Sequence, residues 1–425
     1  MNARWPGGLA PPSGQAQLAR AAGLHPPAGE ADQAMGSRIR AVLVGAGVWG
    51  LEHARALAGR PDVDFRAVAG RTPARTQARA AQFAVRAYTS IPEMIEAEQP
   101  DLVCLSLPNQ EHLQATLEVI RASRALLVEK PIAFELAEAD ALLEEAARRS
   151  LFFAIDFNHH YAKPVGLAYH ALREGRLGEV VFASWRFGGE GGTSHPFNNL
   201  IETQCHAFDL LEFLCGPIDS VMAQMTDLTA RGTYRTVALA LHFRSGAVGS
   251  LVGSYDSSYA YPSSHQLEIN GTRGRLLVED TVRRFTLNAR GSEVAEVWQA
   301  GYFNDRDRAF YRLLDRHLDA VLEALRSGGP PPIHARAGRR ALLLAYAAIA
   351  SFQGGRRVEV ETASWEPAAA PAIAGPRRRR DGAGRPPGLA GRAASRRTSS
   401  RTRAPRARSG PAPSPRAPRP RGRLR

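Results

Sequence analysis

The stretch VLVGAGVWG, residues 42–50, is a short apolar run that ends in three glycines spaced as G-x-G-x-x-G. The apolar run predicts a buried strand, and residues 48–59 have the apolar spacing of a helix. Between a strand and a helix, this pattern is typical of a dinucleotide-binding loop, where glycines allow a tight turn and a close approach of the backbone to a pyrophosphate. We therefore expect a cofactor-binding loop made of Gly45, Ala46, Gly47, Val48, Trp49 and Gly50.

The chain around this loop alternates between predicted strands and predicted helices. Strands are expected at 38–45, 63–70, 101–108, 124–131 and 151–158. The helices between them are expected at 48–59, 73–84, 111–123 and 135–149. Strands that alternate with helices indicate a parallel sheet covered on both faces. Residues 38–157 are thus predicted to form a doubly wound parallel sheet, a Rossmann domain of α/β class.

After Asn158 the pattern changes to closely spaced strands with few helices. A strand is expected at 179–187, and further strands at 220–227, 234–243, 247–255, 265–272, 275–280, 283–289 and 295–300. Helices are expected at 164–175, 203–215, 305–327 and 337–353. This order predicts a C-terminal α+β domain over 158–365, built on a large open mixed or antiparallel sheet.

The charge of the chain is concentrated at its C-terminal end. Of the net charge of +14, residues 376–425 contribute 17 Arg against one acid, which leaves a net charge of −2 for the rest. Residues 1–37 and 366–425 are predicted to be disordered, since their Pro-, Gly- and Arg-rich composition cannot build a core. The basic tail has no aromatic residue for stacking on bases, so we expect non-specific adhesion to nucleic acid at most and no specific nucleic-acid partner.

Cysteine use and hydropathy indicate a cytoplasmic protein. The three cysteines form no C-x-x-C pair, and an odd number argues against a disulfide framework. No apolar run is long enough for a signal peptide or a membrane span. We expect a reducing compartment and no membrane partner.

Cofactor preference is read at the end of the second strand, in AGRT, residues 69–72. An acid at this place would bind the ribose 2′-hydroxyl of NAD, and none is present. Arg71 could hold a 2′-phosphate, and Thr72 could add a hydrogen bond. The expected cofactor is therefore NADP in preference to NAD.

Lysine is rare in this chain, which makes its positions informative. Only Lys130 and Lys163 occur among 55 basic side chains, and Lys130 lies in LLVEKPIA, residues 126–133. An amine can polarise a hydroxyl and relay its proton, and burial can lower its pKa, whereas a guanidinium stays charged. We expect Lys130 to act in catalysis. Lys163, in NHHYAKP (158–164), faces either substrate or solvent.

Four motifs resemble those of the glucose–fructose oxidoreductase / inositol dehydrogenase / rhizopine-catabolism (Gfo/Idh/MocA) family. They are GAGVWGLEHA (45–54), LPNQEHLQ (107–114), VEKPIA (128–133) and QCHAFDLLEFLCG (204–216). The resemblance implies a Rossmann domain, an open-sheet domain that often forms a homodimer or homotetramer interface, and NAD(P)-dependent oxidation or reduction of a sugar or polyol. It also implies that residues after the third and fourth clear strands border the nicotinamide: Pro108, Asn109, His112, Glu129 and Lys130.

A second polar group lies in IETQCHAFDLLEFLCG, residues 201–216. Read as one helix, this segment places Glu202, His206 and Asp209 on a single stripe, which suits a general acid/base oriented by carboxylates. Either His206 or Lys130 would take the hydroxyl proton. The family commonly has Asp and Gly where this chain has Glu202 and Gln204, which suggests a reshaped substrate pocket. Cys205 points off the stripe, so no metal site is expected.

Asn158 and His159, at the end of the fifth strand, are expected to reach the substrate. The Ser- and Tyr-rich segment 250–274 could serve either a subunit interface or the substrate site. Two other functions on this fold stay open at this point. One is a non-catalytic NAD(P)-sensing protein, and the other is an NAD-dependent glycoside hydrolase that recycles its cofactor.

Overall fold

The computed structural model describes residues 38–108 and 112–362. The predictions for 1–37, for Asn109 and for the Arg-rich tail lie outside these residues.

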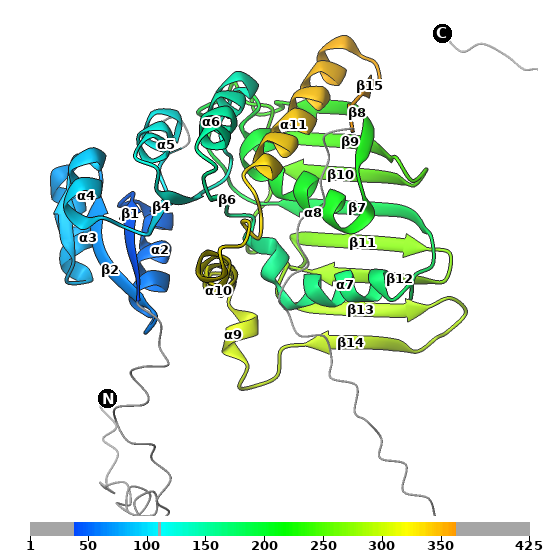
Figure 1. Ribbon diagram of the computed structural model, residues 1–425. Helices are drawn as coiled ribbons and strands as arrows, with labels where there is room; N and C mark the ends of the chain where they lie inside the picture. The colour runs from blue at the N-terminus through cyan, green and yellow to red at the C-terminus, as the bar shows by residue number, and fades with distance from the viewer. Residues whose placement is uncertain (1–37, 109–111, 363–425) are drawn as a thin grey trace, which may run out of the picture. The chain divides into compact units, whose positions relative to one another are not determined.

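The first sheet has six parallel strands in the order β3-β2-β1-β4-β5-β6 (Figure 1). Its strands are β1 (Ile39–Val44), β2 (Val63–Ala69), β3 (Arg86–Tyr88), β4 (Leu102–Leu105), β5 (Ala125–Val128) and β6 (Phe153–Ile155). The helices between them are α2 (Val48–Ala58), α3 (Pro73–Gln82), α4 (Ile91–Glu98), α5 (His112–Arg121) and α6 (Leu136–Arg148). The order reverses between β1 and β4, and the carboxyl ends of these two strands frame the crevice where such sheets bind ligands.

The second sheet has nine strands in the order β14-β13-β12-β11-β7-β10-β9-β8-β15. They are β7 (Val180–Gly188), β8 (Ile218–Thr226), β9 (Thr236–Phe243), β10 (Val248–Ser254), β11 (His265–Gly271), β12 (Gly274–Glu279), β13 (Arg284–Ala289), β14 (Ala295–Gln299) and β15 (Val358–Glu359). The central pair β7–β10 is parallel and all other pairs are antiparallel. The predicted combination of a Rossmann sheet with a large open mixed sheet is confirmed.

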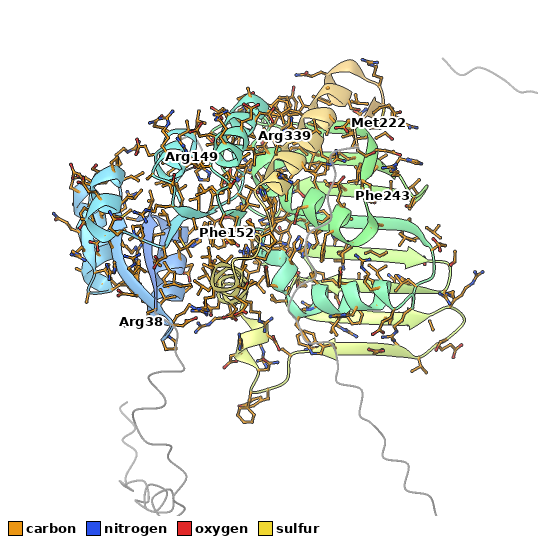
Figure 2. All side chains as sticks on the ribbon, viewed as in Figure 1. Arg38, Arg149, Phe152, Met222, Phe243 and Arg339 are labelled. Atoms are coloured by element: carbon orange, nitrogen blue, oxygen red, sulfur yellow. The ribbon has the colours of Figure 1, made fainter. Side chains whose placement is uncertain are left out.

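Helices pack on one face of the second sheet. They are α7 (Lys163–Arg173), α8 (Cys205–Cys215) and α11 (Arg336–Gly354). Strands β8 and β9 alternate between buried and exposed residues, as a sheet with one covered face requires. Among the side chains labelled in Figure 2, Phe243 of β9 is fully buried, whereas Met222 of β8 is 37% exposed.

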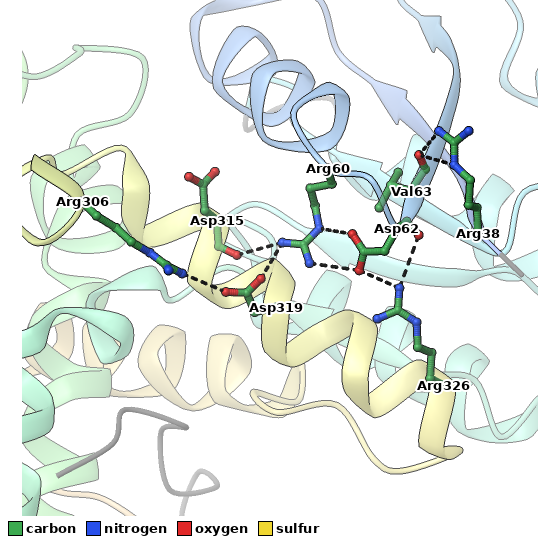
Figure 3. A network of polar contacts seen from close by, with 8 residues as sticks. All are labelled: Arg38, Arg60, Asp62, Val63, Arg306, Asp315, Asp319 and Arg326. Carbon is green, nitrogen blue, oxygen red and sulfur yellow. Dashed lines mark hydrogen bonds and ion pairs between the residues drawn. The ribbon is translucent and has the colours of Figure 1, made fainter. Parts of the chain in front are cut away.

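Helix α10 (Arg312–Ser327) returns to the first sheet after the second sheet is complete. It contributes four leucine and valine side chains to the core cluster that contains β1 and α2 residues: Leu314, Leu318, Val321 and Leu322. An ionic network fastens the same helix to the α2–β2 turn (Figure 3). Asp62 accepts hydrogen bonds from Arg60 and Arg326, and Arg60 also donates to Asp319 at 2.6 Å.

Three elements differ from the predicted ones. Strand β3 and helix α4 were not predicted, because β3 has only three residues, none of them fully buried, and thus no apolar run. The helix predicted at 305–327 is interrupted: α9 (Asp305–Arg308) ends before Ala309, and α10 begins at Arg312. The interruption turns Phe310 and Tyr311 toward the site described below.

Candidate active site

The glycine loop has the geometry that its sequence predicts. Gly45 has φ +127°, and a Cβ there would lie 1.9 Å from the carbonyl oxygen of Ser106. A Cβ on Gly50 would lie 2.2 Å from the carbonyl oxygen of Gly45, whereas a Cβ on Gly47 would meet nothing within 4 Å. Gly45 and Gly50 thus serve packing, and Gly47 faces open space at the N-terminus of α2. Because this terminus has free amides and no acid in its first turn, it fits a pyrophosphate.

A cavity of about 540 Å³ lies beside this loop, near the end of β2. Arg71 lines it, whereas Thr72 is the residue before α3 and is not among the lining residues. Glu118 of α5 lines the cavity from another side, and the one acid of β2, Asp64, is not among the lining residues. Arg79 of α3, which was not predicted, donates hydrogen bonds to the carbonyl oxygens of Ala46 and Gly47 and braces the loop.

The main cavity has a volume of about 690 Å³. Its lining residues come from the chain segment that forms the first sheet and from the segment that forms the second sheet. Seven residues predicted for the site line it: Trp49, Glu129, Lys130, Asn158, His159, Glu202 and His206. Among the residues predicted for catalysis, for the nicotinamide or for the substrate, four with described positions do not line it: Pro108, His112, Lys163 and Asp209. Trp49 of the glycine loop and the predicted proton-transfer groups Lys130 and His206 therefore face one space.

Lys130 follows β5 and is held against the π-helical turn Asn199–Thr203. Its Nζ donates a hydrogen bond to the carbonyl oxygen of Glu202 at 3.2 Å. Burial lowers the pKa of the Lys130 ammonium, but the charges of Cys205, Glu129 and Glu202 outweigh it, so the pKa is raised. The net shift of this pKa is thus opposite to the effect of burial alone, because the lysine is buried together with carboxylates. Lys130 is therefore a charged hydrogen-bond donor.

A buried chain of polar groups lies behind Lys130. His53 Nε2 is hydrogen-bonded to Glu129 Oε1 at 2.8 Å, and His317 Nδ1 to Asp156 Oδ1 at 2.6 Å. Burial raises the pKa of Glu129, but the hydrogen bond to His53 outweighs it and the pKa is lowered. Burial, followed by the charge of Glu129, raises the pKa of Asp156 well above its ordinary value. Glu129 is therefore the ionised carboxylate beside Lys130, and Asp156 retains a proton.

The ligand-type atoms of His53, Glu129 and Asp156 lie within 4.8 Å of one another. His53 Nε2 and Glu129 are hydrogen-bonded to each other, whereas His53 Nδ1 and Asp156 Oδ2 are buried without a hydrogen-bond partner among the described residues. His53 and Asp156 were missed by sequence reasoning, although His53 lies in the quoted motif GAGVWGLEHA.

His206 stacks on His159 with ring centroids 4.2 Å apart and planes inclined by 4°. Burial, then the neighbouring His159 and Lys130, lowers the pKa of His206 well below its ordinary value. Burial similarly lowers the pKa of His159. Both rings are therefore neutral, and the Nδ1 atom of each is buried without a hydrogen-bond partner among the described residues.

The carboxylates predicted to orient His206 have other partners. Asp209 is hydrogen-bonded to His160 at 2.6 Å, and the Glu202 carboxylate accepts a hydrogen bond from Asn198. Residues 199–203 form a π-helical turn and α8 begins only at Cys205, so Glu202 does not lie in one regular helix with His206. Asp209 shares α8 with His206, but its carboxylate contacts His160. The wider turn breaks the i,i+4 relation on which the predicted stripe depended.

Three other predicted residues have structural surroundings. His112 is fully buried, and its ring bridges the carbonyl oxygens of Leu107 and Pro131, so it shapes the loop instead of facing the cavity. Gln204 accepts a hydrogen bond from Trp185 and fills the space above Gly253, so its side chain does not reshape the pocket wall. Lys163 is the first residue of α7 and lies away from the cavity lining.

Aromatic side chains make up much of the remaining cavity wall. The Ser- and Tyr-rich segment supplies Tyr255, Tyr259 and Tyr261 to this wall. Trp49 packs against Phe310 and Tyr311, with ring centroids 6.5 and 5.7 Å apart. Sequence reasoning missed Phe310 and Tyr311, because they were placed inside a continuous helix, and it also missed these residues: Phe187, Glu190, His265, Asp280 and Thr281.

Comparison with known families agrees with this geometry. Residues 39–157 match the family described as "Oxidoreductase family, NAD-binding Rossmann fold". Residues 166–277 match "GFO/IDH/MocA C-terminal domain". The chain belongs to the GFO/IDH/MocA oxidoreductase family. This family member is an enzyme, and its named relatives are dehydrogenases and reductases that act on sugars and polyols.

Curated relatives cover most of the chain at low identity. Myo-inositol 2-dehydrogenase of Thermotoga maritima is 25% identical over 297 residues, which are 65% of this chain and 84% of the relative. D-Apiose dehydrogenase of Paraburkholderia graminis is 25% identical over 365 residues, 79% of this chain and 92% of the relative. The solved structure of levoglucosan dehydrogenase with NADH and levoglucosan has a TM-score of 0.70 at 17% identity, covering 76% of this chain and all (100%) of the other. That likeness supports the fold alone.

Within residues 38–108 and 112–362, none of the helices combines the length and the apolar character needed to cross a bilayer.

Proposed function

We propose that this family member is an NAD(P)-dependent dehydrogenase or reductase of a sugar, inositol or related polyol, with Lys130 and His206 as its proton-transfer groups. The observation that carries the proposal is the shared cavity. One wall holds a buried ammonium, another holds a neutral imidazole, and Trp49 of the glycine loop borders both. Sugar and polyol substrates agree with the names of the curated relatives.

Different residues of the chain bind the cofactor, stabilise charge and accept the proton. The loop Gly45–Gly50 holds the pyrophosphate, and NAD(P), when bound, supplies the hydride acceptor for oxidation or the donor for reduction. In oxidation, the Lys130 ammonium donates a hydrogen bond to the reacting hydroxyl oxygen and stabilises the negative charge that develops there. Neutral His206 takes the hydroxyl proton. The buried chain behind Glu129 keeps Lys130 charged.

Two other functions were open from the sequence. A protein that only senses NAD(P) has no use for a buried ammonium and imidazole in one cavity, and it does not fit a family of enzymes. A glycoside hydrolase that recycles its cofactor would use the same groups. A screen of sugars, inositols and sugar acids with NAD and NADP, read at the nicotinamide absorbance, tests the proposal. Net formation of reduced cofactor is expected, and product formation without it would favour the hydrolase.

We also propose that NADP is preferred to NAD. Arg71 lines the cavity beside the end of β2, and β2 supplies no acid for a ribose hydroxyl. The variant Arg71→Asp should shift the ratio of kcat/KM values toward NAD. A wild-type protein that turns over NAD well and excludes NADP would contradict this preference.

Three further features belong to the proposal. The domain boundary is set at 157–158, with 38–157 binding the cofactor and 158–365 the substrate. A homodimer or homotetramer is expected, because β8 and β9 turn alternate residues to a face that α7, α8 and α11 do not cover. A cytoplasmic location agrees with three cysteines that are all free thiols.

A further inference from the structure

A glycine-rich segment at the end of β7 places Glu190, an exposed residue, at the main cavity. The segment is GGEGG, residues 188–192, and Glu190 lines the cavity. A Cβ on Gly189 would lie 2.3 Å from the ring of Tyr259, and a Cβ on Gly191 would lie 2.1 Å from the ring of Tyr255. Only glycines let the backbone lie this close to both rings, so the segment is built to hold Glu190 against them.

The two tyrosines are fixed by their own hydroxyl groups. Tyr259 donates a hydrogen bond to the carbonyl oxygen of Glu190 at 3.2 Å. The Tyr255 hydroxyl is hydrogen-bonded to Thr203 at 2.7 Å. With its hydroxyl engaged, Tyr259, which is 56% exposed, offers ring surface to a ligand, whereas Tyr255 is buried and supports the wall from behind. The faces of aromatic rings carry partial negative charge and attract the polarised C–H groups of a sugar or cyclitol ring.

The charged groups around the cavity are mostly acidic. Four carboxylates line it: Glu129, Glu190, Glu202 and Asp280. Lys130 is the one Lys or Arg side chain among the described lining residues, and burial lowers the pKa values of the lining histidines, so they add no charge. Even with Asp280 paired to Arg283 at 3.1 Å, the wall around the ligand is net negative. A carboxylate on the ligand would meet Lys130 as the one Lys or Arg cation of the described lining, within a wall that is otherwise acidic.

Several buried polar atoms of the cavity wall lack a hydrogen-bond partner among the described residues: Asn158 Oδ1, His159 Nδ1, His206 Nδ1 and His265 Nε2. All four belong to residues that are at least nine-tenths buried. Hydroxyl groups can satisfy such atoms in either direction, because each hydroxyl both donates and accepts. The wall thus calls for a ligand that carries several hydroxyl groups.

We infer that the cavity takes an uncharged, ring-shaped polyhydroxyl ligand and disfavours the carboxylate counterpart of the same ring, with Glu190 accepting hydrogen bonds from ligand hydroxyls. The inference rests on the proposed function for the place of the ligand and adds its chemical class. Glu190 acts as a specificity residue through an unfavourable like-charge contact with acids and a favourable contact with hydroxyls.

The test compares matched pairs of ligands on the full chain with bound NADP. Isothermal titration calorimetry is carried out with D-glucose and D-glucuronate, with D-galactose and D-galacturonate, and with myo-inositol. The uncharged member of a pair should bind about tenfold or more tighter than its acid. In Glu190→Gln this preference should fall about threefold or more. The matched control Glu293→Gln, at an exposed site outside the cavity, should keep the wild-type preference.

An acid that binds as tightly as its uncharged partner would overturn the inference, as would a preference that Glu190→Gln leaves unchanged or binding by none of the ligands. The proposed function fails differently. In that case uncharged rings would bind with the expected preference, but no sugar, inositol or sugar acid of the screen would change the nicotinamide absorbance.

Discussion

At the scale of single residues, charge decides what each group of the site can do. Lys130 is buried beside Glu129 and Glu202, which raise the pKa of its ammonium, while His206 is buried among other bases, which lowers the pKa of its imidazole. Two groups that face one cavity are thereby set in opposite protonation states. One donates a hydrogen bond to the reacting oxygen, and the other is free to take a proton.

Replacement of Lys130 by arginine should separate charge from geometry. Lys130→Arg keeps the positive charge but places a planar guanidinium where a compact amine donates to the Glu202 carbonyl. Turnover should fall by about two orders of magnitude, with cofactor binding retained. The matched control is Lys163→Arg, at the other lysine of the chain, which should have near-normal turnover. Equal turnover in both variants would contradict a specific role for the Lys130 amine.

The acidic side of the pH profile should report on His206. Oxidation requires the neutral imidazole, and a lowered pKa means that protonation sets in only well below the ordinary value of ~6.5. We therefore expect kcat/KM for oxidation to stay level from pH 8 down to about pH 6.5 and to fall only in more acidic solution. Steady-state kinetics across this range provide the measurement. An acidic limb with its midpoint at or above ~6.5 would rule out this protonation state.

Asp156 should make stability depend on pH. Its folded-state pKa is raised, so the stability it contributes is complete below its unfolded-state pKa and is lost progressively as the pH rises toward the folded-state value. In Asp156→Asn the amide oxygen can still accept from His317, and no proton has to be retained. As the pH rises from 5 to 8, the free energy of unfolding of the variant minus that of the wild type should increase by up to ~1.4 kcal/mol per pH unit. Denaturant titrations measure this, with the exposed Asp305→Asn as control, and a constant difference would contradict it.

At the scale of elements, the sequence was sufficient to predict those elements whose signal lies within a single segment. The glycine loop and the long strands of both sheets were predictable because an apolar run, a glycine spacing or an alternation lies within a single segment. The loop Gly45–Gly50 and the strand β9 are examples. The π-helical turn at 199–203 was not predictable, because its residues have ordinary helical spacing.

Partners across elements were the least predictable part of the site. Glu202, His206 and Asp209 were identified as polar residues of one segment, but which group each contacts depends on residues far along the chain. His160, from the turn after β6, is hydrogen-bonded to Asp209, and His159 stacks on His206. Likewise Asp156 and His317 are 161 residues apart, and only the packing of α10 brings them together.

The glycine loop offers a matched pair of substitutions at this scale. In Gly45→Ala the new Cβ would collide with the Ser106 backbone at a φ of +127°, so the melting temperature should fall sharply. In Gly47→Ala the Cβ enters open space, so the melting temperature should hold while the Kd for cofactor rises about tenfold or more, because the methyl group occupies the pyrophosphate site. Thermal unfolding and cofactor titration of both variants check this. Equal loss of stability in the two variants would be the contrary outcome.

At the scale of the whole molecule, helix α10, which follows the strands β7–β14 of the second sheet in the chain, packs on the first sheet. Residues 35–365 should match the full chain in melting temperature and activity, because both sheets and both family matches lie within them. Residues 38–157 alone should not fold stably, because they lack the apolar face of α10 that packs with β1 and α2. Circular dichroism melts of both fragments test this. A cooperative melt of 38–157 at the full chain's temperature would contradict the role of α10.

The return of α10 to the first sheet has a consequence for how this fold can be recombined. A chimera that joins the cofactor half of one relative to the substrate half of another at residue 157 would pair β1 and α2 with a foreign α10. The apolar face of α10 would then pack against non-native residues; its side chains are Leu314, Leu318, Val321 and Leu322. Asp319 would lack its native partner Arg60. Gene shuffling among such oxidoreductases should therefore succeed chiefly when the crossover carries the 312–327 segment along with the cofactor half.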